Sequence, residues 1–187
     1  MPDEMICLHH TLSSSRANGP GNRYVIWTQG CSFNCPGCFN PETFSATAGR
    51  DYSVDDLARD ILLSQDKVEG ITLSGGEPLL QHRALAKLLS RVHQSANLGV
   101  ILFTGFTWVE LQHIPQISTF LAEIDLVIAG RYQQENHLAR HLIGSTNKTL
   151  HYLTSKYHHP DLNTPPAEVI ISADGSLNLS GIDPLKW

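Results

Sequence analysis

The sequence has no long apolar run, and its first ten residues, MPDEMICLHH, lack the basic start and apolar stretch of a secretory signal peptide. No segment approaches the roughly 18 consecutive apolar residues that a membrane-spanning helix needs. Both absences argue against a secreted or membrane protein, so we expect a cytoplasmic protein without a membrane partner. Thiols stay reduced in the cytoplasm, and disulfides are therefore not expected.

Basic residues are also scarce. The chain carries 13 Lys and Arg against 18 Asp and Glu, a formal net charge of −5 at neutral pH. Nucleic-acid-binding proteins usually carry a basic excess, so we predict no nucleic-acid partner. Long polar tracts are absent as well. A hydrophobic content of 41% in 187 residues indicates one ordinary globular domain, with room for a short appendix.

Cysteine is rare and unevenly distributed. Of the four cysteines, Cys7 stands alone among apolar neighbours and is expected to be a buried small hydrophobe. The other three, Cys31, Cys35 and Cys38, lie within eight positions of the segment TQGCSFNCPGCFNPETF, residues 28–44. Reduced thiols at such close spacing favour metal binding or catalysis over disulfides.

The hydrophobic pattern alternates between strands and helices. Strands are predicted at 23–30, 70–78, 98–106 and 124–132, and helices at 53–65, 82–93 and 107–112. This order indicates an α/β fold with a mostly parallel sheet covered by helices. Sites in such sheets form beyond the carboxyl ends of the strands. The cysteine loop and the SGGEP, TGF and AGRY turns all fall there, so we expect them to meet.

The C-terminal part differs in composition. The segment KYHHPDLNTPP (156–166) has the composition of a linker. The two strand-like arms of AEVIISADGSLNLSG (167–181) flank Asp174-Gly175, a two-residue hairpin signal. We therefore predict a core domain over residues 1–155, followed by a linker and β-hairpin extension over residues 156–187.

Three clustered thiols admit two kinds of metal site. With one of the ten histidines they would make a zinc site, although no C-x-x-C…H pattern follows the loop. An iron–sulfur cube normally takes four cysteine ligands, so three would leave one iron open to a small molecule. On the residues alone, a non-catalytic metal-binding module stays an alternative to a catalytic cluster.

The C-x-x-x-C-x-x-C loop after a first strand resembles the signature of radical S-adenosylmethionine (SAM) enzymes. In that superfamily the open iron of a 4Fe–4S cluster chelates the amino and carboxylate groups of SAM. Four ordered blocks carry a closer resemblance, to the activating proteins of anaerobic ribonucleotide reductase: NGPGNRYVIWTQGCSFNCPGCFNPETF, GITLSGGEPL, FTGF and IDLVIAGRY…GSTNKTLHYL. They cover residues 18 to about 153. The resemblance implies that the α/β fold is a partial, open radical SAM (β/α) barrel.

The same resemblance assigns roles to the cysteines and to the glycine turn. Cys31, Cys35 and Cys38 would ligate the cluster and so act as the catalytic metal ligands. Gly75, Gly76 and Glu77 would hold the amino group of SAM. Their residue types suit this role, because glycines allow positive φ and close approach of the backbone to a ligand, and Glu77 supplies a carboxylate.

Further residues are candidates for binding SAM. Phe39 follows the last cysteine and would pack near the adenine, and Asn40 would hydrogen-bond the loop or the ligand. Thr104 follows the third predicted strand, where the activators carry a TG pair. Arg131 suits charge pairing with the SAM carboxylate. Ala129 stands where the family pattern leads us to expect Asp, a departure that affects the polar contacts at that strand end.

The implied chemistry is reductive cleavage of SAM to methionine and a 5′-deoxyadenosyl radical. That radical would take a hydrogen from a backbone glycine of a glycyl-radical enzyme, an anaerobic ribonucleotide reductase by the closest resemblance. The sequence holds no second cysteine cluster, so electrons are expected from a flavodoxin-like donor. The C-terminal extension motivates an alternative, a radical SAM enzyme that acts on a different peptide or on a small molecule.

Overall fold

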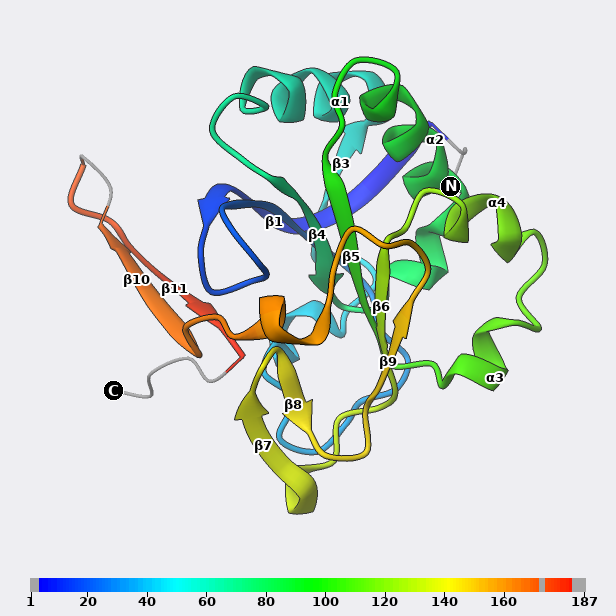
Figure 1. Ribbon diagram of the computed structural model, residues 1–187, viewed down its shortest axis with the longest axis vertical. Helices are drawn as coiled ribbons and strands as arrows, with labels where there is room; N and C mark the ends of the chain where they lie inside the picture. Colours follow the sequence, from blue (N-terminus) through cyan, green and yellow to red (C-terminus); the bar gives the residue numbers. More distant parts are fainter. Residues whose placement is uncertain (1–3, 172–173, 183–187) are drawn as a thin grey trace.

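A central sheet organises the protein, whose computed structural model describes residues 4–171 and 174–182 (Figure 1). The strands of this sheet are β1 (Met5–Ser15), β2 (Arg23–Thr28), β3 (Arg50–Ser53), β4 (Gly70–Gly75), β5 (Gly99–Thr104), β6 (Leu126–Ala129) and β9 (Thr149–Tyr152). Within the described residues their order is β3-β1-β2-β4-β5-β6-β9.

The four predicted strands form the parallel centre of the sheet. β2, β4, β5 and β6 pair in parallel, with Tyr24 opposite Ile71 and Leu102 opposite Val127. Their carboxyl ends therefore meet at one edge, as the sequence pattern predicts. The flanking pairs, of β1 with β2 and β3 and of β9 with β6, are antiparallel, and β1, β3 and β9 were not among the predicted strands.

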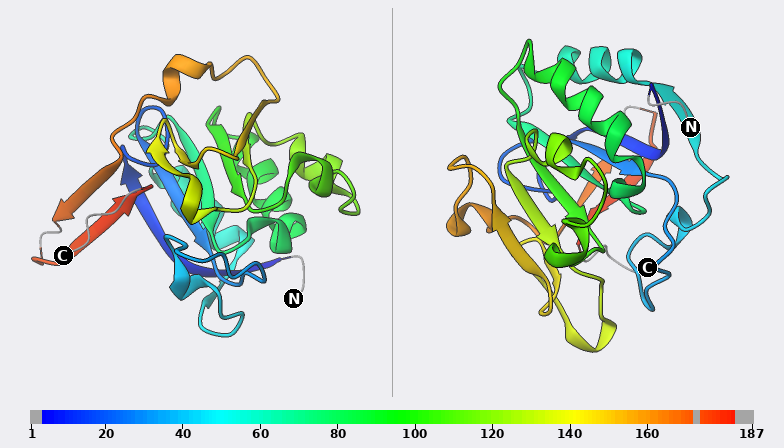
Figure 2. Two further views of the ribbon diagram at one scale, coloured as in Figure 1. Left: turned by 90° about the horizontal axis from the view of Figure 1, so that it is seen from below. Right: turned by 90° about the vertical axis from the view of Figure 1, so that its right-hand side faces the viewer.

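Helices cover one face of the sheet (Figure 2). They are α1 (Val54–Leu63), α2 (His82–His93), α3 (Trp108–Leu111) and α4 (Ile117–Leu121), of which only α4 lacks a predicted counterpart. Ser53 caps α1, since its side chain accepts from the Asp56 backbone N–H and satisfies one of the first free donors of the helix. The apolar stripes of α1 and α2 bury Ile61, Leu85 and Leu88 against the sheet, which removes the main apolar surface from water.

The opposite face of the sheet carries a smaller apolar cluster that includes residues from beyond β9. This cluster consists of Ile101, Leu126, Ile128, Leu142, Tyr157 and Leu162. Tyr157 also receives a hydrogen bond of 2.5 Å from the guanidinium of Arg23, which is fully buried at the start of β2. The same guanidinium donates to the carbonyls of Ile71 and Gly99. These bonds hold the segment after β9 across the amino ends of the parallel strands.

Two short hairpins complete the described structure. One pairs β7 (His137–Arg140) with β8 (Ile143–Ser145), and the other pairs β10 (Ala167–Ile171) with β11 (Leu177–Gly181). The second is the predicted C-terminal hairpin, and it projects from the side of the sheet (Figures 1 and 2). Its register pairs Ile171 with Leu177. The predicted turn residues Asp174 and Gly175 lie between the two strands, where Gly175 has φ +85° and the Asp174 carboxylate accepts from the Ser176 backbone N–H at 2.9 Å. Residues 172 and 173 lie outside the described residues.

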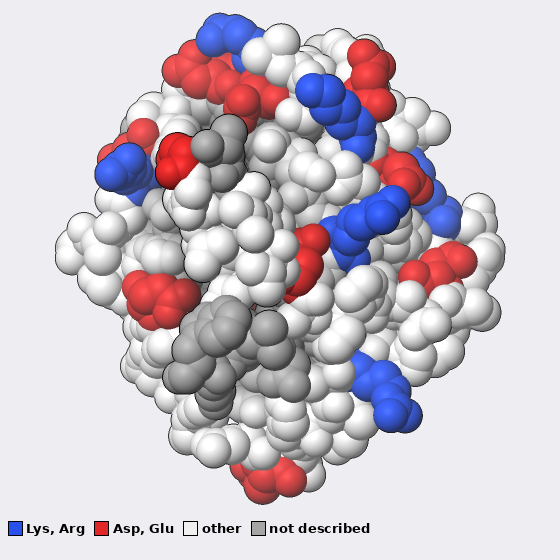
Figure 3. All heavy atoms as spheres, turned by 90° about the vertical axis from the view of Figure 1, so that its left-hand side faces the viewer, with Lys and Arg blue, Asp and Glu red and all other residues white. Residues whose placement is uncertain are grey.

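The face that carries the hairpin is largely uncharged, with acidic and basic side chains interspersed on it (Figure 3). Three apolar side chains of the hairpin are exposed, namely Val169, Ile171 and Leu177. None of the helices in the described part of the chain has the length and apolar character needed to cross a membrane.

Candidate functional site

The cysteine loop begins where β2 ends, at the carboxyl edge of the parallel strands. Short backbone hydrogen bonds close it on itself, from Gly30 N to Thr43 O (2.8 Å) and from Cys38 N to Cys35 O (3.2 Å). The short 3-10 turn Pro41–Thr43 follows the third cysteine. All three thiols are free, and they line a single cavity. Cys7, by contrast, is buried away from this cavity, as predicted.

The thiols lie close enough to influence one another electrostatically. Burial raises the pKa of Cys31 and of Cys38, and the neighbouring Cys35 thiol raises both pKa values further. A bound metal centre reverses this effect, because its positive charge stabilises the thiolate form. In residues 4–171 and 174–182 no three His, Cys, Asp or Glu side chains converge as they would around a single ion. The cysteine ligands of a four-iron cluster bind different iron atoms, so they lie further apart than the ligands of a single ion.

The glycine turn after β4 packs directly against the cysteine loop. Gly75 has φ +99°, a conformation that favours glycine. Glu77 N donates to the carbonyl of Gly30 at 2.8 Å, so the two loops share a hydrogen bond. A Cβ atom on Gly76 would lie only 2.4 Å from that same carbonyl oxygen. The glycines are therefore required for this contact, and it brings both predicted motifs to one cavity.

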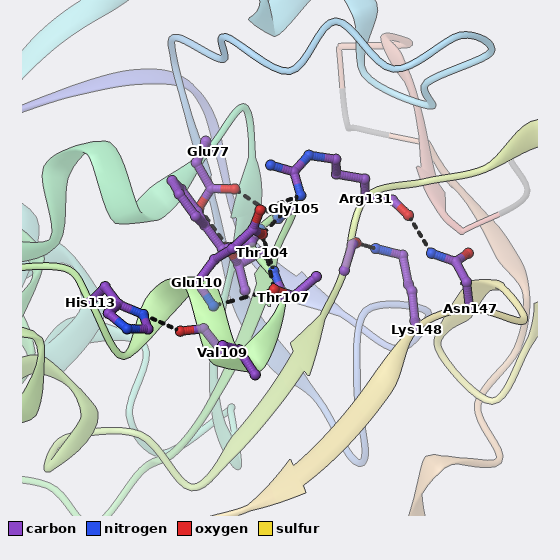
Figure 4. A network of polar contacts seen from close by, with 12 residues as sticks. Glu77, Thr104, Gly105, Thr107, Val109, Glu110, His113, Arg131, Asn147 and Lys148 are labelled. Carbon is purple, nitrogen blue, oxygen red and sulfur yellow. Dashed lines mark hydrogen bonds and ion pairs between the residues drawn. The ribbon is translucent and has the colours of Figure 1, made fainter.

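Glu77 has no exposed surface and is surrounded by donors (Figure 4). Its Oε1 accepts from the Thr104 hydroxyl (2.9 Å) and from the Leu79 backbone (2.9 Å), and its Oε2 accepts from Gly105 N (2.7 Å). Burial raises the pKa of Glu77 to about 7, although these three hydrogen bonds act in the opposite direction. A cationic ligand in the cavity would stabilise the ionised carboxylate.

Three further predicted residues also line the cavity. The Phe39 ring lies 4.7 Å, centre to centre, from the ring of Tyr132. The Asn40 amide is 3.5 Å from the carbonyl oxygen of Gly75, so it touches the glycine turn only at the limit of a hydrogen bond. Thr104 lines the cavity and holds Glu77.

Arg131, the predicted partner of the SAM carboxylate, is paired with a carboxylate of the protein itself. Its guanidinium donates to both carboxylate oxygens of Glu110 (3.0 and 2.8 Å) and lies 4.3 Å from the centre of the Phe33 ring. This pairing with Arg131, together with the Thr107 cap, lowers the pKa of Glu110 to about 2. Arg131 does not line the cavity within the described residues. Ala129, at the position of the expected Asp, is buried in β6 and pairs with Thr149.

Several cavity-lining residues were not predicted. Phe33 covers Gly105, where a Cβ atom would lie 2.5 Å from its ring. Lys148 contributes an ammonium group, and its segment GSTNKTLHYL was noted only as part of the resemblance. Asn18, Gly181 and Ile182 also line the cavity. Phe33 lies within the cysteine loop itself, between Cys31 and Cys35. No spacing signal marks the other residues, because only the folded chain brings them to the cysteines.

The donor set fits a 4Fe–4S cluster with a bound SAM. Three free thiols supply the cluster ligands, and the glycine turn packs directly against their loop. A buried carboxylate lies in the same wall. Fold and site therefore define an iron–sulfur enzyme of the radical SAM class.

Comparisons with known proteins identify the family. The family described as a 4Fe-4S single cluster domain matches residues 17–151. The anaerobic ribonucleoside-triphosphate reductase-activating protein of Vibrio cholerae serotype O1 is 32% identical over 144 residues, which cover 73% of this chain and 92% of the relative. The chain belongs to this family of radical SAM activating enzymes, which are oxidoreductases with a 4Fe–4S cluster and SAM as cofactors.

Two further similarities were found. The pyruvate formate-lyase-activating enzyme of Staphylococcus aureus (strain USA300) is 38% identical over 93 residues, covering 47% of this chain and 37% of the relative. The crystal structure of QueE from Escherichia coli matches with a TM-score of 0.49 and 13% identity, over 67% of this chain and 70% of that chain.

Proposed function

We propose that this protein activates an anaerobic ribonucleotide reductase by generating a glycyl radical on it. The observation that carries the proposal is the shared cavity of the three thiols and the Gly75-Gly76-Glu77 turn. The relative that matches most of the chain is named for activating that reductase. Bound at these residues, a reduced cluster and SAM would supply the one-electron chemistry that cleaves SAM and removes a hydrogen atom from the partner's glycine.

The site residues take distinct roles in this proposal. Cys31, Cys35 and Cys38 ligate the cluster and leave one iron open. Glu77 receives the SAM amino group, and the two glycines before it admit the ligand close to the backbone. Phe39 and Asn40, on the loop after the last cysteine, flank the ligand, while Thr104 fixes the Glu77 carboxylate.

The fold is proposed to be an open version of the radical SAM (β/α) barrel. Its support is the parallel core β2-β4-β5-β6 with helices on one face and the cavity at the carboxyl ends. Residues 1–155 would form the core domain, and 156–187 the linker and hairpin extension. The family match, which ends at residue 151, supports this division.

The partner and the electron donor belong to the same proposal. A protein substrate must bring its glycine within about 3–3.5 Å of the reactive carbon, so the partner has to insert a segment into the cavity. Electrons come from a flavodoxin-like donor, since the sequence holds no second cysteine cluster. The location is cytoplasmic. A different peptide substrate is the second candidate, favoured by the exposed apolar side chains of the hairpin.

The test is anaerobic reconstitution with iron and sulfide, followed by reduction with dithionite in the presence of SAM. We expect a brown protein that produces 5′-deoxyadenosine, and a glycine-centred EPR doublet when the reductase is added. Cys38→Ala should lose both colour and product. Cys7→Ala is the matched control, because Cys7 lies outside the cavity, and it should retain both.

Two results would change the conclusion. Cleavage of SAM without an EPR doublet on the reductase would remove this partner and favour another peptide substrate. Stoichiometric zinc, with no iron or sulfide taken up, would show a non-catalytic metal module instead.

A further inference from the structure

The cavity wall holds one cationic side chain among the described residues, that of Lys148. Lys148 lies in the turn between β8 and β9, and its backbone N–H donates to Ser145 O at 3.2 Å, which fixes the turn. Its ammonium group donates to the carbonyl oxygen of Gly130, 2.5 Å away at the end of β6 (Figure 4). The side chain is therefore held at the carboxyl edge of the sheet, where the predicted motifs meet.

Among the residues that the structure describes, none places an opposite charge in direct contact with the ammonium of Lys148. Burial lowers its pKa, while Cys35, Glu77 and Cys38 raise it through space. No carboxylate of the described residues forms an ion pair with it. A desolvated ammonium is costly unless an anion pairs with it, and a single carbonyl does not supply that charge. The position thus favours an anionic ligand.

Arg131, the cation that the sequence suggested for this role, is already engaged. Its guanidinium forms two hydrogen bonds with Glu110 and lies 4.3 Å from the centre of the Phe33 ring, which lines the cavity, whereas Arg131 itself is not among the lining residues. An anion in the cavity would have to compete with Glu110 for this guanidinium.

The charges that line the cavity are complementary to one class of small molecule. Glu77 offers a buried carboxylate from the turn after β4, and Lys148 offers an ammonium from the turn before β9. An α-amino acid carries the opposite pair, an ammonium and a carboxylate on one carbon. The methionyl part of SAM is such a group, and charge-assisted hydrogen bonds at both ends would fix its orientation.

We propose that Lys148, rather than Arg131, binds the SAM carboxylate, while Glu77 binds the SAM amino group. This inference rests on the proposed function, because it takes SAM as the ligand. Lys148 is accordingly a positioning residue of the cofactor site. It acts by holding the methionyl end and does not take part in electron transfer.

The experiment compares Lys148→Met with the wild-type protein, both reconstituted with the cluster. Dissociation constants are measured by equilibrium dialysis for SAM and for decarboxylated SAM, which lacks only the carboxylate. Lys148→Met should weaken SAM binding roughly 10- to 100-fold, the range for a lost hydrogen bond to a charged group, and leave decarboxylated SAM unaffected. Lys148→Arg should retain most of the preference for SAM.

Lys156→Met is the matched control. Lys156 also donates to a backbone carbonyl, that of Asn97 (3.0 Å), but it does not line the cavity. This variant should bind both ligands as the wild type does. Iron content and far-UV circular dichroism of each variant verify that the cluster and the fold are intact.

Three outcomes would overturn the inference. Equal weakening of both ligands by Lys148→Met would show a general structural role. Unchanged SAM affinity with an altered midpoint potential of the SAM-free cluster would make Lys148 a counter-charge of the thiolates. A Lys148→Met protein that fails to take up the cluster, while Lys148→Arg prefers SAM no more than its decarboxylated form, would also refute it. Failure of the proposed function is distinct, because the wild type itself would then bind no SAM.

Discussion

The Thr104 hydroxyl donates to the Glu77 carboxylate over 2.9 Å, which joins the end of β5 to the turn after β4. Both side chains are buried, so this bond is shielded from water. It orients the carboxylate that the proposed function assigns to the SAM amino group. Two predictions concern this pair.

Thr104→Val should destabilise the cluster-free protein. The substitution keeps the shape of the side chain but removes a donor to a buried carboxylate, and it also removes the acceptor of the Phe106 N–H. We expect a loss of about 1–3 kcal/mol in the free energy of unfolding, measured by urea titration at pH 8. Thr119→Val, on the exposed side of α4, should change it by less than about 0.5 kcal/mol. Equal effects of the two substitutions would contradict the role of the bond.

The stability of the cluster-free protein should depend on the ionisation of Glu77. Its pKa is raised to about 7 in the folded state, above its value in the unfolded chain. The folded state therefore holds this proton more tightly, and stability is lost as the pH rises from about 4.5 through 7, by an amount on the order of 3 kcal/mol.

Glu77→Gln isolates this effect, because the amide resembles the protonated carboxyl and does not titrate. The difference in unfolding free energy between the wild type and this variant should change over that pH window and level off above it. A difference that stays constant from pH 4.5 to 8 would mean that Glu77 keeps an ordinary pKa.

Arg131→Met should raise the pKa of Glu110 from about 2 towards its usual value near 4.5. The Arg131 hydrogen bond is the largest cause of the depression, ahead of the Thr107 cap. The sign follows from linkage: the stabilisation by ionised Glu110 is present above pH 4.5 and is lost as the pH falls through 2. The measurement is an NMR titration of the Glu110 side chain. Arg59→Met, which removes a different surface ion pair, should leave that titration unchanged.

Asn18→Ala should loosen the C-terminal hairpin. The buried Asn18 amide donates to Ser15 Oγ (2.7 Å) and to Ser180 Oγ (2.6 Å), and the Glu168 carboxylate accepts from the Arg16 backbone (3.0 Å). Removal of the amide leaves only the hydrogen bonds of Glu168 among those that join residues 15–18 to the hairpin. We expect faster amide hydrogen exchange in β10 and β11, with unchanged protection in β4 and β5.

Asn178→Ala is the control for this prediction, because Asn178 lies on the same hairpin and takes no part in these hydrogen bonds. Its exchange pattern should match that of the wild type. If Asn18→Ala gave wild-type exchange in β10 and β11, the hairpin would have to be held by other contacts.

Local motifs were predictable from the sequence, while long-range partners were not. The cysteine spacing and the Ser-Gly-Gly-Glu-Pro turn are recognisable within a few residues of sequence. The parallel arrangement of the strands places both motifs at one edge of the sheet. β1 and β9 escaped prediction because neither has a clean alternation of buried and exposed residues, and their pairing depends on distant strands. Lys148 has no local signature either. The role proposed for Lys148 depends on the pairing of Arg131 with Glu110, and that contact is visible only in the folded chain.

Gly181 and Ile182, at the end of the hairpin, line the same cavity as the cysteines although they lie past residue 151, where the family match stops. One side of the reaction chamber is therefore built from a part of the chain that the shared family core does not specify. Among relatives, an exchange of C-terminal appendages would reshape that chamber without touching a single cluster ligand. Substrate preference can diverge in this way while the radical chemistry stays the same.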